Sequence, residues 1–244
     1  MKLNHYQFII IIALFSNFQI LGQDTENGVT SQYWADYSPS TKISEKVNFE
    51  GTIGYRTNSP QLWNRYFIKG KFKYKRKKNI KNKLFYSEQF SAGLGVYYTN
   101  NFYVSDRIEI IPVQSYSLTW PNTNKLKLNH NFDLEERFEL NTKNWKNNFG
   151  LRLSYEPTLT LYFQGNSTEF RKGFYLPVSL YLYWNLIDVQ QFNDRIRVTP
   201  GIGYAFSPKW KGAFLIGYNY SKVTKDENFY KSDVIFRFRV YHNL

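Results

Sequence analysis

Residues 65–75, with the sequence RYFIKGKFKYK, decide the fold of this chain. Tyr, Ile, Gly, Phe and Tyr occupy the even positions, whereas Arg and Lys occupy the odd positions, with Phe67 as the exception. Successive side chains of a strand point to opposite faces, so this alternation predicts a strand that is apolar on one face and basic on the other. No comparable stretch of the chain has the spacing of a helix.

The same alternation recurs along most of the chain. About eleven segments show it, separated by residues typical of turns, such as those at 58–60, 121–124 and 207–209. The segments are 29–37, 45–56, 65–75, 90–98, 108–118, 126–138, 147–164, 176–184, 196–206, 214–220 and 234–240. The sequence therefore predicts an all-β protein.

The number of strands follows from a parity rule. Bacterial single-chain barrels have an even number of antiparallel strands, so a count of about eleven is off by one. If residues 147–164 fold back near Pro157 the barrel has twelve strands, and if 29–37 is not a full strand it has ten. We predict an antiparallel transmembrane β-barrel of about twelve strands, with ten as the alternative, with apolar side chains facing lipid and a charged lumen.

The composition favours a membrane barrel over a soluble β-protein. Aromatic residues make up 20% of the chain and charged residues another 21%. A soluble domain rarely combines the two, whereas a membrane barrel needs aromatic girdles outside and a polar lumen inside. Tyr55, Tyr74, Tyr98 and Trp184 stand near the ends of segments, where such girdles lie. The alternative is a soluble periplasmic lipid carrier.

The first residues have the pattern of a secretory signal peptide. Lys2 gives a positive start, Phe8–Phe15 is apolar, and the small residue Gly22 ends the segment. We therefore expect residues 1–22 to be a signal peptide and residues 23–244 to form a single β-barrel domain. The expected location is the outer membrane of a Gram-negative bacterium.

Cleavage of this segment is a testable prediction. The mature chain is expected to begin near Gln23, because Gly22 is the small residue that precedes the cleavage site. N-terminal sequencing of the protein from the outer membrane checks this. An intact Met1 in that fraction would contradict export by a cleaved signal.

The charge and the lack of cysteine limit the classes of function. The net charge is +13 and there is no cysteine, which excludes disulfides, thiol nucleophiles, zinc–thiolate sites and the lipid-bearing cysteine of a lipoprotein. Nine of the fifteen residues from 69 to 83 are Lys or Arg, so this segment is either a solvated hairpin loop or a contact for lipid phosphates. No nucleic-acid recognition motif is present, and no nucleic-acid partner is expected.

The order of several local patterns resembles a known bacterial family. The patterns are Trp34 in an early strand, Arg56 at the end of the next, Glu109, Pro112 and Gln114 before Trp120 and Pro121, and the runs LEERF (134–138), RIR (195–197), PGIGY (200–204) and SPKW (207–210). On these residues the chain resembles the family called domain of unknown function 2490. The resemblance implies an exported outer-membrane barrel and brings no activity.

Charged side chains on the polar faces of the strands form the candidate site. We expect a lumen charge network of Glu50, Arg56, Arg65, Lys69, Arg107, Glu109, Asp133, Glu135, Arg137, Arg195 and Arg197. In it, Glu50 meets Lys69 or Lys71. We interpret the network as an ion-pair ladder that fills a narrow lumen, because charges in a low-dielectric interior need partners. A paired acid and base, or a Ca²⁺ site, is the alternative.

Two ion pairs follow from the hairpin expected at 121–124. If this turn is tight, Glu109 faces Arg137 and Arg107 faces Glu139. Turn geometry sets the register, so the pairing can be shifted by two residues.

The histidines do not form a catalytic pattern. His130 shares a strand face with Leu128 and Phe132, and His242 stands two residues from the end. A Ser–His hydrolase needs both groups at one site, and no pair of histidines has the spacing of metal ligands. The Gly-Ile-Gly at 201–203 lies in a predicted strand and lacks the helix of a nucleotide loop. We therefore expect no enzymatic activity, no metal and no cofactor.

The expected function is that of a non-enzymatic outer-membrane barrel with a narrow or plugged lumen. Such a barrel is either a small anion-preferring channel or a lipid-binding barrel. The alternative is an outer-membrane enzyme that modifies lipid or lipopolysaccharide. The expected partners are outer-membrane lipid, lipopolysaccharide and the barrel-assembly machinery that inserts the protein; the sequence names no small-molecule ligand.

Overall fold

The computed structural model describes residues 30–59, 62–80, 84–123, 125–164, 172–187, 194–222 and 230–244. The expected signal peptide, residues 1–22, lies outside these ranges. The strands are β1 (Thr30–Lys42), β2 (Val47–Ser59), β3 (Trp63–Ile80), β4 (Leu84–Asn101), β5 (Arg107–Asn122), β6 (Leu126–Asn141), β7 (Asn147–Tyr162), β8 (Gly173–Asn185), β9 (Arg195–Ala205), β10 (Trp210–Ser221) and β11 (Tyr230–Asn243). Within the described ranges, no helix is long and apolar enough to cross a membrane.

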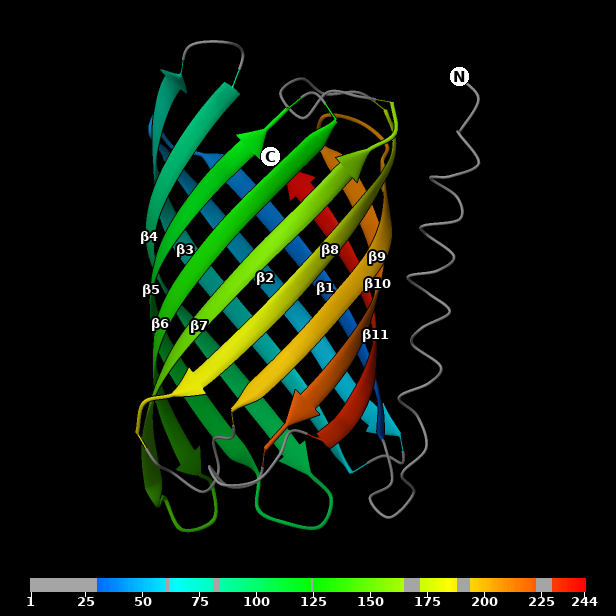
Figure 1. Ribbon diagram of the computed structural model, residues 1–244. Coiled ribbons are helices and arrows are strands. Elements are labelled where there is room, and N and C mark those ends of the chain that lie inside the picture. Colours follow the sequence, from blue (N-terminus) through cyan, green and yellow to red (C-terminus); the bar gives the residue numbers. More distant parts are fainter. Residues whose placement is uncertain are drawn as a thin grey trace.

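These strands close into one barrel (Figure 1). Each strand is antiparallel to the next in sequence, whereas β1 and β11 pair in parallel, from Thr30↔Asp233 to Ser40↔Asn243. An odd number of strands that alternate in direction leaves the first and last pointing the same way, so the closing pair is parallel. The predicted all-β barrel is confirmed.

The predicted number of strands is wrong, both for twelve and for the alternative of ten. The described residues form eleven strands. Residues 147–164 do not fold back, because β7 runs without a break and Pro157 pairs with His130 of β6. The segment predicted at 29–37 is a full strand, since β1 has 13 residues. The parity rule failed because it assumes antiparallel closure.

The two faces of the strands follow the predicted alternation. On β3, Ile68 is 57% exposed on the outside, and Phe72 is 56% exposed. Lys69 lines the interior. Phe67, the exception in the pattern, is 4% exposed and stacks on Tyr97 of β4 inside the barrel. The break in the alternation therefore marks an aromatic residue in the lumen.

Aromatic side chains gather near both ends of the outer face. We call the end where β1 and β11 begin the N-terminal end, and the end that carries the C-terminus the C-terminal end (Figure 1). Exposed aromatic residues near the N-terminal end include Tyr33, Tyr66, Tyr98 and Trp184, and those near the C-terminal end include Tyr74, Trp120, Phe206 and Trp210. Two polar side chains also point outward between these ends, Gln114 of β5 and Glu136 of β6.

Side-chain hydrogen bonds close the short turn between β9 and β10. Ser207 Oγ accepts hydrogen bonds from the backbone N–H groups of Lys209 at 3.3 Å and Trp210 at 3.1 Å. This turn sets the register of the hairpin, in which Tyr204 pairs with Gly212. The aromatic ring thus stands opposite a residue without a side chain.

A carboxylate closes the connection between β4 and β5. Asp106 accepts hydrogen bonds from the Tyr98 hydroxyl at 2.5 Å and from the backbone N–H of Asn101 at 2.9 Å. These bonds, the one from Tyr98 foremost, hold the pKa of Asp106 below its ordinary value because they favour the charged form. Their contribution to stability is therefore present above the ordinary pKa of Asp and is lost as the pH falls through the lowered one.

Candidate functional site: the lumen

The barrel interior contains a cavity of about 1140 Å³, lined by residues from all eleven strands. Among the described residues that line it, fifteen are Lys or Arg and six are Asp or Glu. Most of the others are Ser, Thr, Asn, Gln and Tyr. Polar side chains therefore predominate among the described lining residues, and basic ones outnumber acidic ones.

The structure places every residue of the predicted charge network at this cavity. The lining includes Glu50, Arg56, Arg65, Lys69, Arg107, Glu109, Asp133, Glu135, Arg137, Arg195 and Arg197. These residues come from β2, β3, β5, β6 and β9, so the alternation of each strand directs their side chains inward.

Ion pairs link β5 and β6 as the hairpin prediction requires. Arg137 Nε donates a hydrogen bond to Glu109 Oε1 at 2.6 Å, and Arg107 Nη1 lies 3.5 Å from Glu139 Oε1. The register differs by two residues from the predicted one, in which Glu109 lies opposite Arg137. In the structure Glu109 lies opposite Glu139. The pairs form diagonally, since long side chains reach a neighbour two residues along the opposite strand.

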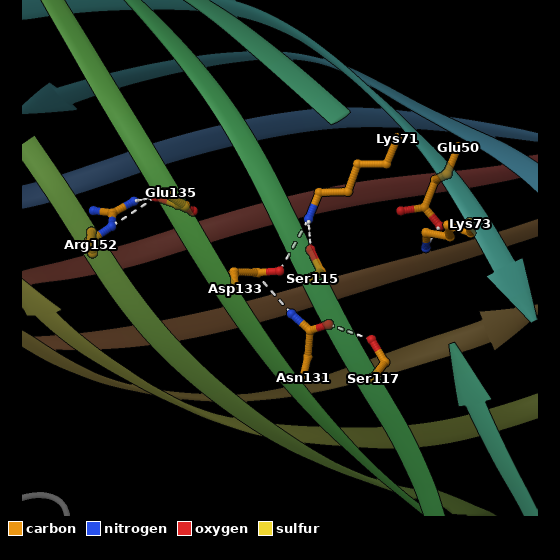
Figure 2. Close-up of polar contacts among 9 residues, drawn as sticks. All are labelled: Glu50, Lys71, Lys73, Ser115, Ser117, Asn131, Asp133, Glu135 and Arg152. Carbon is orange, nitrogen blue, oxygen red and sulfur yellow. Dashed lines mark hydrogen bonds and ion pairs between the residues drawn. The ribbon is translucent and has the colours of Figure 1, made fainter. Parts of the chain in front are cut away.

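Glu50 has a different partner from the two lysines suggested by the sequence, Lys69 and Lys71. Its backbone pairs with Lys71, yet its carboxylate accepts a hydrogen bond from Lys73 Nζ at 2.5 Å (Figure 2). The register that the sequence implied is therefore correct for Lys71, but the ion pair is diagonal.

Lys71 instead reaches across to β5 and β6. Its ammonium group lies 3.1 Å from Ser115 Oγ and 3.4 Å from Asp133 Oδ1. Figure 2 shows the Lys71 side chain pointing toward both residues. Arg152 Nε of β7 donates a hydrogen bond to Glu135 Oε2 at 2.9 Å, a contact also drawn in Figure 2. These contacts join four strands, β3 and β5 to β7, through side chains inside the lumen.

Asp36 joins the first and last strands inside the barrel. Its Oδ2 accepts hydrogen bonds from Arg237 Nε at 2.6 Å and from Arg239 Nη2 at 3.0 Å, and its side chain is fully buried. At the start of this seam, the Thr30 hydroxyl donates to Asp233 Oδ1 at 2.6 Å. The parallel seam is thus held by charged side chains as well as by the backbone ladder.

Trp34 stands next to this seam among three arginines. Its side chain is 6% exposed. The guanidinium carbons of Arg56, Arg197 and Arg237 lie 3.9, 4.8 and 5.2 Å from the centroid of its ring. The negative face of an indole attracts cations, so Trp34 holds side chains of β2, β9 and β11 together across the lumen.

Phe67 packs into the space left by a glycine. A Cβ at Gly54 would lie 2.2 Å from the Phe67 ring and 2.8 Å from Asp36 Oδ1. The Phe67 ring also stacks on the Tyr97 ring, with ring centroids 5.2 Å apart. These buried groups and Trp34 fill the lumen on the side of β1 to β4.

The sequence analysis did not single out several residues of this network. They are Asp36, Arg152, Glu156, Arg237 and Arg239. A signal was present, because Arg237 and Arg239 alternate with Phe236 and Phe238 along β11. Alternation shows that such residues point inward, but it does not show that Asp36 meets a residue 201 positions away.

Both histidines outside the expected signal peptide lie on the outer face. His130 Nδ1 is 2.7 Å from the Tyr155 hydroxyl, and its Nε2 is 3.3 Å from the Trp120 carbonyl oxygen. His242 Nδ1 is 2.7 Å from the Tyr37 hydroxyl. Neither histidine has Ser or a carboxylate as its hydrogen-bond partner in the described ranges. In those ranges no group of three or more His, Cys, Asp and Glu residues is placed to hold a metal ion.

Comparison with known proteins assigns a family. The fold is similar to that of the translocator domain of autotransporter NalP from Neisseria meningitidis, with 13% sequence identity, a TM-score of 0.36, and coverage of 89% of this chain and 90% of that chain. A search of curated proteins found no match to the sequence. The model of the family described as protein of unknown function (DUF2490) matches residues 31–230, which run from β1 to the first residue of β11. The chain therefore belongs to the DUF2490 family, as the resemblance of its local patterns implied.

Proposed function

We propose that this protein is a non-enzymatic barrel of the bacterial outer membrane, with a narrow lumen that admits small anions. The outer face supports the membrane location, since large apolar side chains such as Ile53, Ile68 and Phe238 are more than half exposed. Soluble proteins rarely expose apolar surface on this scale. The strands have 11–18 residues, and about 9–11 tilted residues cross a bilayer. Outer-membrane lipid and lipopolysaccharide would then surround the barrel, and the barrel-assembly machinery would insert it.

The excess of positive charge in the lining carries the proposal of anion preference. Rings or rows of Lys and Arg select anions in pores, because they raise the local anion concentration and exclude cations. Fifteen basic and six acidic residues among the described lining residues give the lumen that character.

Packing of the interior supports a small conductance. Trp34, Phe67 and Tyr97 project inward from β1, β3 and β4, and the ion pairs of Asp36 and Glu109 cross between strands. These side chains occupy part of the section of the barrel, so large solutes are excluded while small ions pass through the remaining cavity.

Planar-bilayer recordings test this proposal. The unmodified protein is expected to give small, anion-selective current steps. Replacing Glu109 and Glu135 together with Gln removes two negative charges from the lining and is expected to raise the anion preference, because Arg137 and Arg152 lose their partners.

Glu136→Gln is the matched control for that double variant. It removes a carboxylate of the same strand from the outer face, and the selectivity is expected to stay unchanged. Large cation-selective steps from the unmodified protein would contradict both the narrow lumen and the sign of its charge.

The proposed absence of enzymatic activity has its own test. Purified, folded protein incubated with phospholipid and lipopolysaccharide is expected to release no fatty acid or sugar. Lipid hydrolysis that disappears in His130→Gln or in Glu135→Gln would replace the proposal with that of a lipid-modifying enzyme.

A further inference from the structure

Seven cations that line the cavity form no ion pair among the described residues. They are Arg56, Arg65, Lys69, Lys127, Arg195, Arg197 and Lys211. The basic residues that do pair with a carboxylate there are Lys71, Lys73, Arg107, Arg137, Arg152, Arg237 and Arg239. Lys127 and Lys211 lie near the C-terminal end of the barrel, apart from the other five cations.

Two aromatic rings bring three of these cations together. Arg56 and Arg197 both lie over the Trp34 ring, at 3.9 and 4.8 Å from its centroid. Arg56 also lies 4.6 Å from the centroid of the Phe67 ring, and Lys69 Nζ lies 5.3 Å from the same centroid. Arg56 thus shares the Trp34 ring with Arg197 and the Phe67 ring with Lys69, and we call these three cations the cluster.

The hydrogen-bonding capacity of the cluster is only partly used. Among the described residues, Arg56 Nε is buried without a hydrogen-bond partner, and the same holds for Arg195 Nε on the neighbouring part of the lining. Arg197 Nε donates a hydrogen bond to Asn219 Oδ1 at 2.6 Å, and Arg65 Nε donates one to Thr99 Oγ1 at 2.7 Å. Buried donors of a charged group without acceptors are costly, so this cluster has donors available for a ligand.

The buried carboxylate of Asp36 does not neutralise the cluster. Asp36 Oδ2 already accepts hydrogen bonds from Arg237 and Arg239, and its Oδ1 has no hydrogen-bond partner in the described part of the chain. Buried cations that repel one another need a counter-charge within a few ångströms. A bound anion supplies that charge without any change in the fold.

We propose that Arg56, Lys69 and Arg197 bind a phosphate group inside the lumen. Guanidinium groups match the oxygen atoms of a tetrahedral oxyanion with two parallel N–H donors, and a lysine adds a point charge. The three side chains line the cavity, so a ligand that enters the lumen reaches them. The inference rests on the proposed anion-admitting lumen and adds to it a binding site and a class of ligand, a phosphate that is either free or carried by a small organic molecule.

Equilibrium binding to the detergent-solubilised, folded protein tests this site without any measurement of current. Inorganic phosphate is titrated calorimetrically at constant ionic strength, with chloride as the comparison anion. We expect saturable binding of phosphate that is tighter than that of chloride. A parallel titration with glycerol phosphate distinguishes the two sources, since tighter binding of the ester assigns the site to an organic phosphate and weaker binding assigns it to free phosphate.

The matched variants are Arg56→Gln and Lys211→Gln. Lys211 is also a cation of the lining, but it lies near the C-terminal end and outside the cluster. Phosphate affinity is expected to fall about tenfold or more in Arg56→Gln and to stay within about twofold in Lys211→Gln. Lys69→Gln is the second variant, with the same expected direction, if Arg56→Gln does not fold.

Two results would overturn the proposed site. The first is the absence of saturable phosphate binding by the unmodified protein. The second is an equal loss of affinity in Arg56→Gln or Lys69→Gln and in Lys211→Gln, which would show attraction by net charge alone. Anion-selective currents together with either result would leave the proposed conduction standing while removing the site, so the two failures are distinguishable.

Discussion

Asp36→Asn is expected to lower the free energy of unfolding by about 3–5 kcal/mol, because it leaves two buried arginines without their shared anion. Asp36 is fully buried and accepts hydrogen bonds from both Arg237 and Arg239. The asparagine keeps the volume of the side chain but removes its charge, so the loss reports on the ion pairs rather than on packing. The effect falls on the seam where β1 and β11 close the barrel.

Urea unfolding of the detergent-solubilised protein, followed by tryptophan fluorescence, measures this change. Glu50→Gln is the matched control, because the Glu50 side chain is 42% exposed and pairs with one lysine, Lys73. An exposed pair of this kind contributes less than about 1 kcal/mol. Equal losses for the two variants would show that the seam does not depend on Asp36.

Arg in place of Ile68 or of Phe236 is expected to destabilise the folded protein in a bilayer by about 2–4 kcal/mol. Both residues point outward, Ile68 at 57% exposure between Ile53 and Val96, and Phe236 beside Tyr33 with ring centroids 5.7 Å apart. If lipid surrounds the barrel, a guanidinium at either position lies in hydrocarbon. The cost of removing it from water then appears as lost stability.

Refolding titrations into lipid vesicles measure this cost. Asn131→Arg is the control, because Asn131 lines the cavity and its amide donates to Asp133 at 2.9 Å, where an arginine gains a carboxylate partner. A much smaller loss is expected for this variant. Similar losses at Ile68 and Asn131 would argue against lipid on the outer face, and with it against the proposed membrane location.

Local alternation allowed the orientation of the side chains to be predicted. The odd positions of β3 were expected to share a polar face, and Lys69, Lys71 and Lys73 all line the cavity. The prediction succeeds because the two-residue period is a property of the extended backbone itself. Phe67 obeys this geometry too, and only its chemistry departs from the pattern.

Pairing between neighbouring strands could be predicted less sharply. The Glu109–Arg137 pair follows from a short connection between β5 and β6, but the register is shifted by two residues. The turn and the ladder next to it set this register: the first pair is Asn122↔Lys127, and an irregularity between Thr119 and Asn122 changes the offset by one residue before Thr119↔Asn129. A local irregularity of this kind moves every later pair by the same amount, and the alternation carries no trace of it.

The sequence by itself determined that the chain is all-β and which residues share each face of a strand. Each of these depends on the backbone period and on residues close together in the chain. Only the tertiary structure decided that eleven strands close through a parallel pair, and that Asp36 meets Arg237 and Arg239 there. Closure depends on the tilt and stagger of all the strands together, so no single segment encodes which two strands meet at the seam.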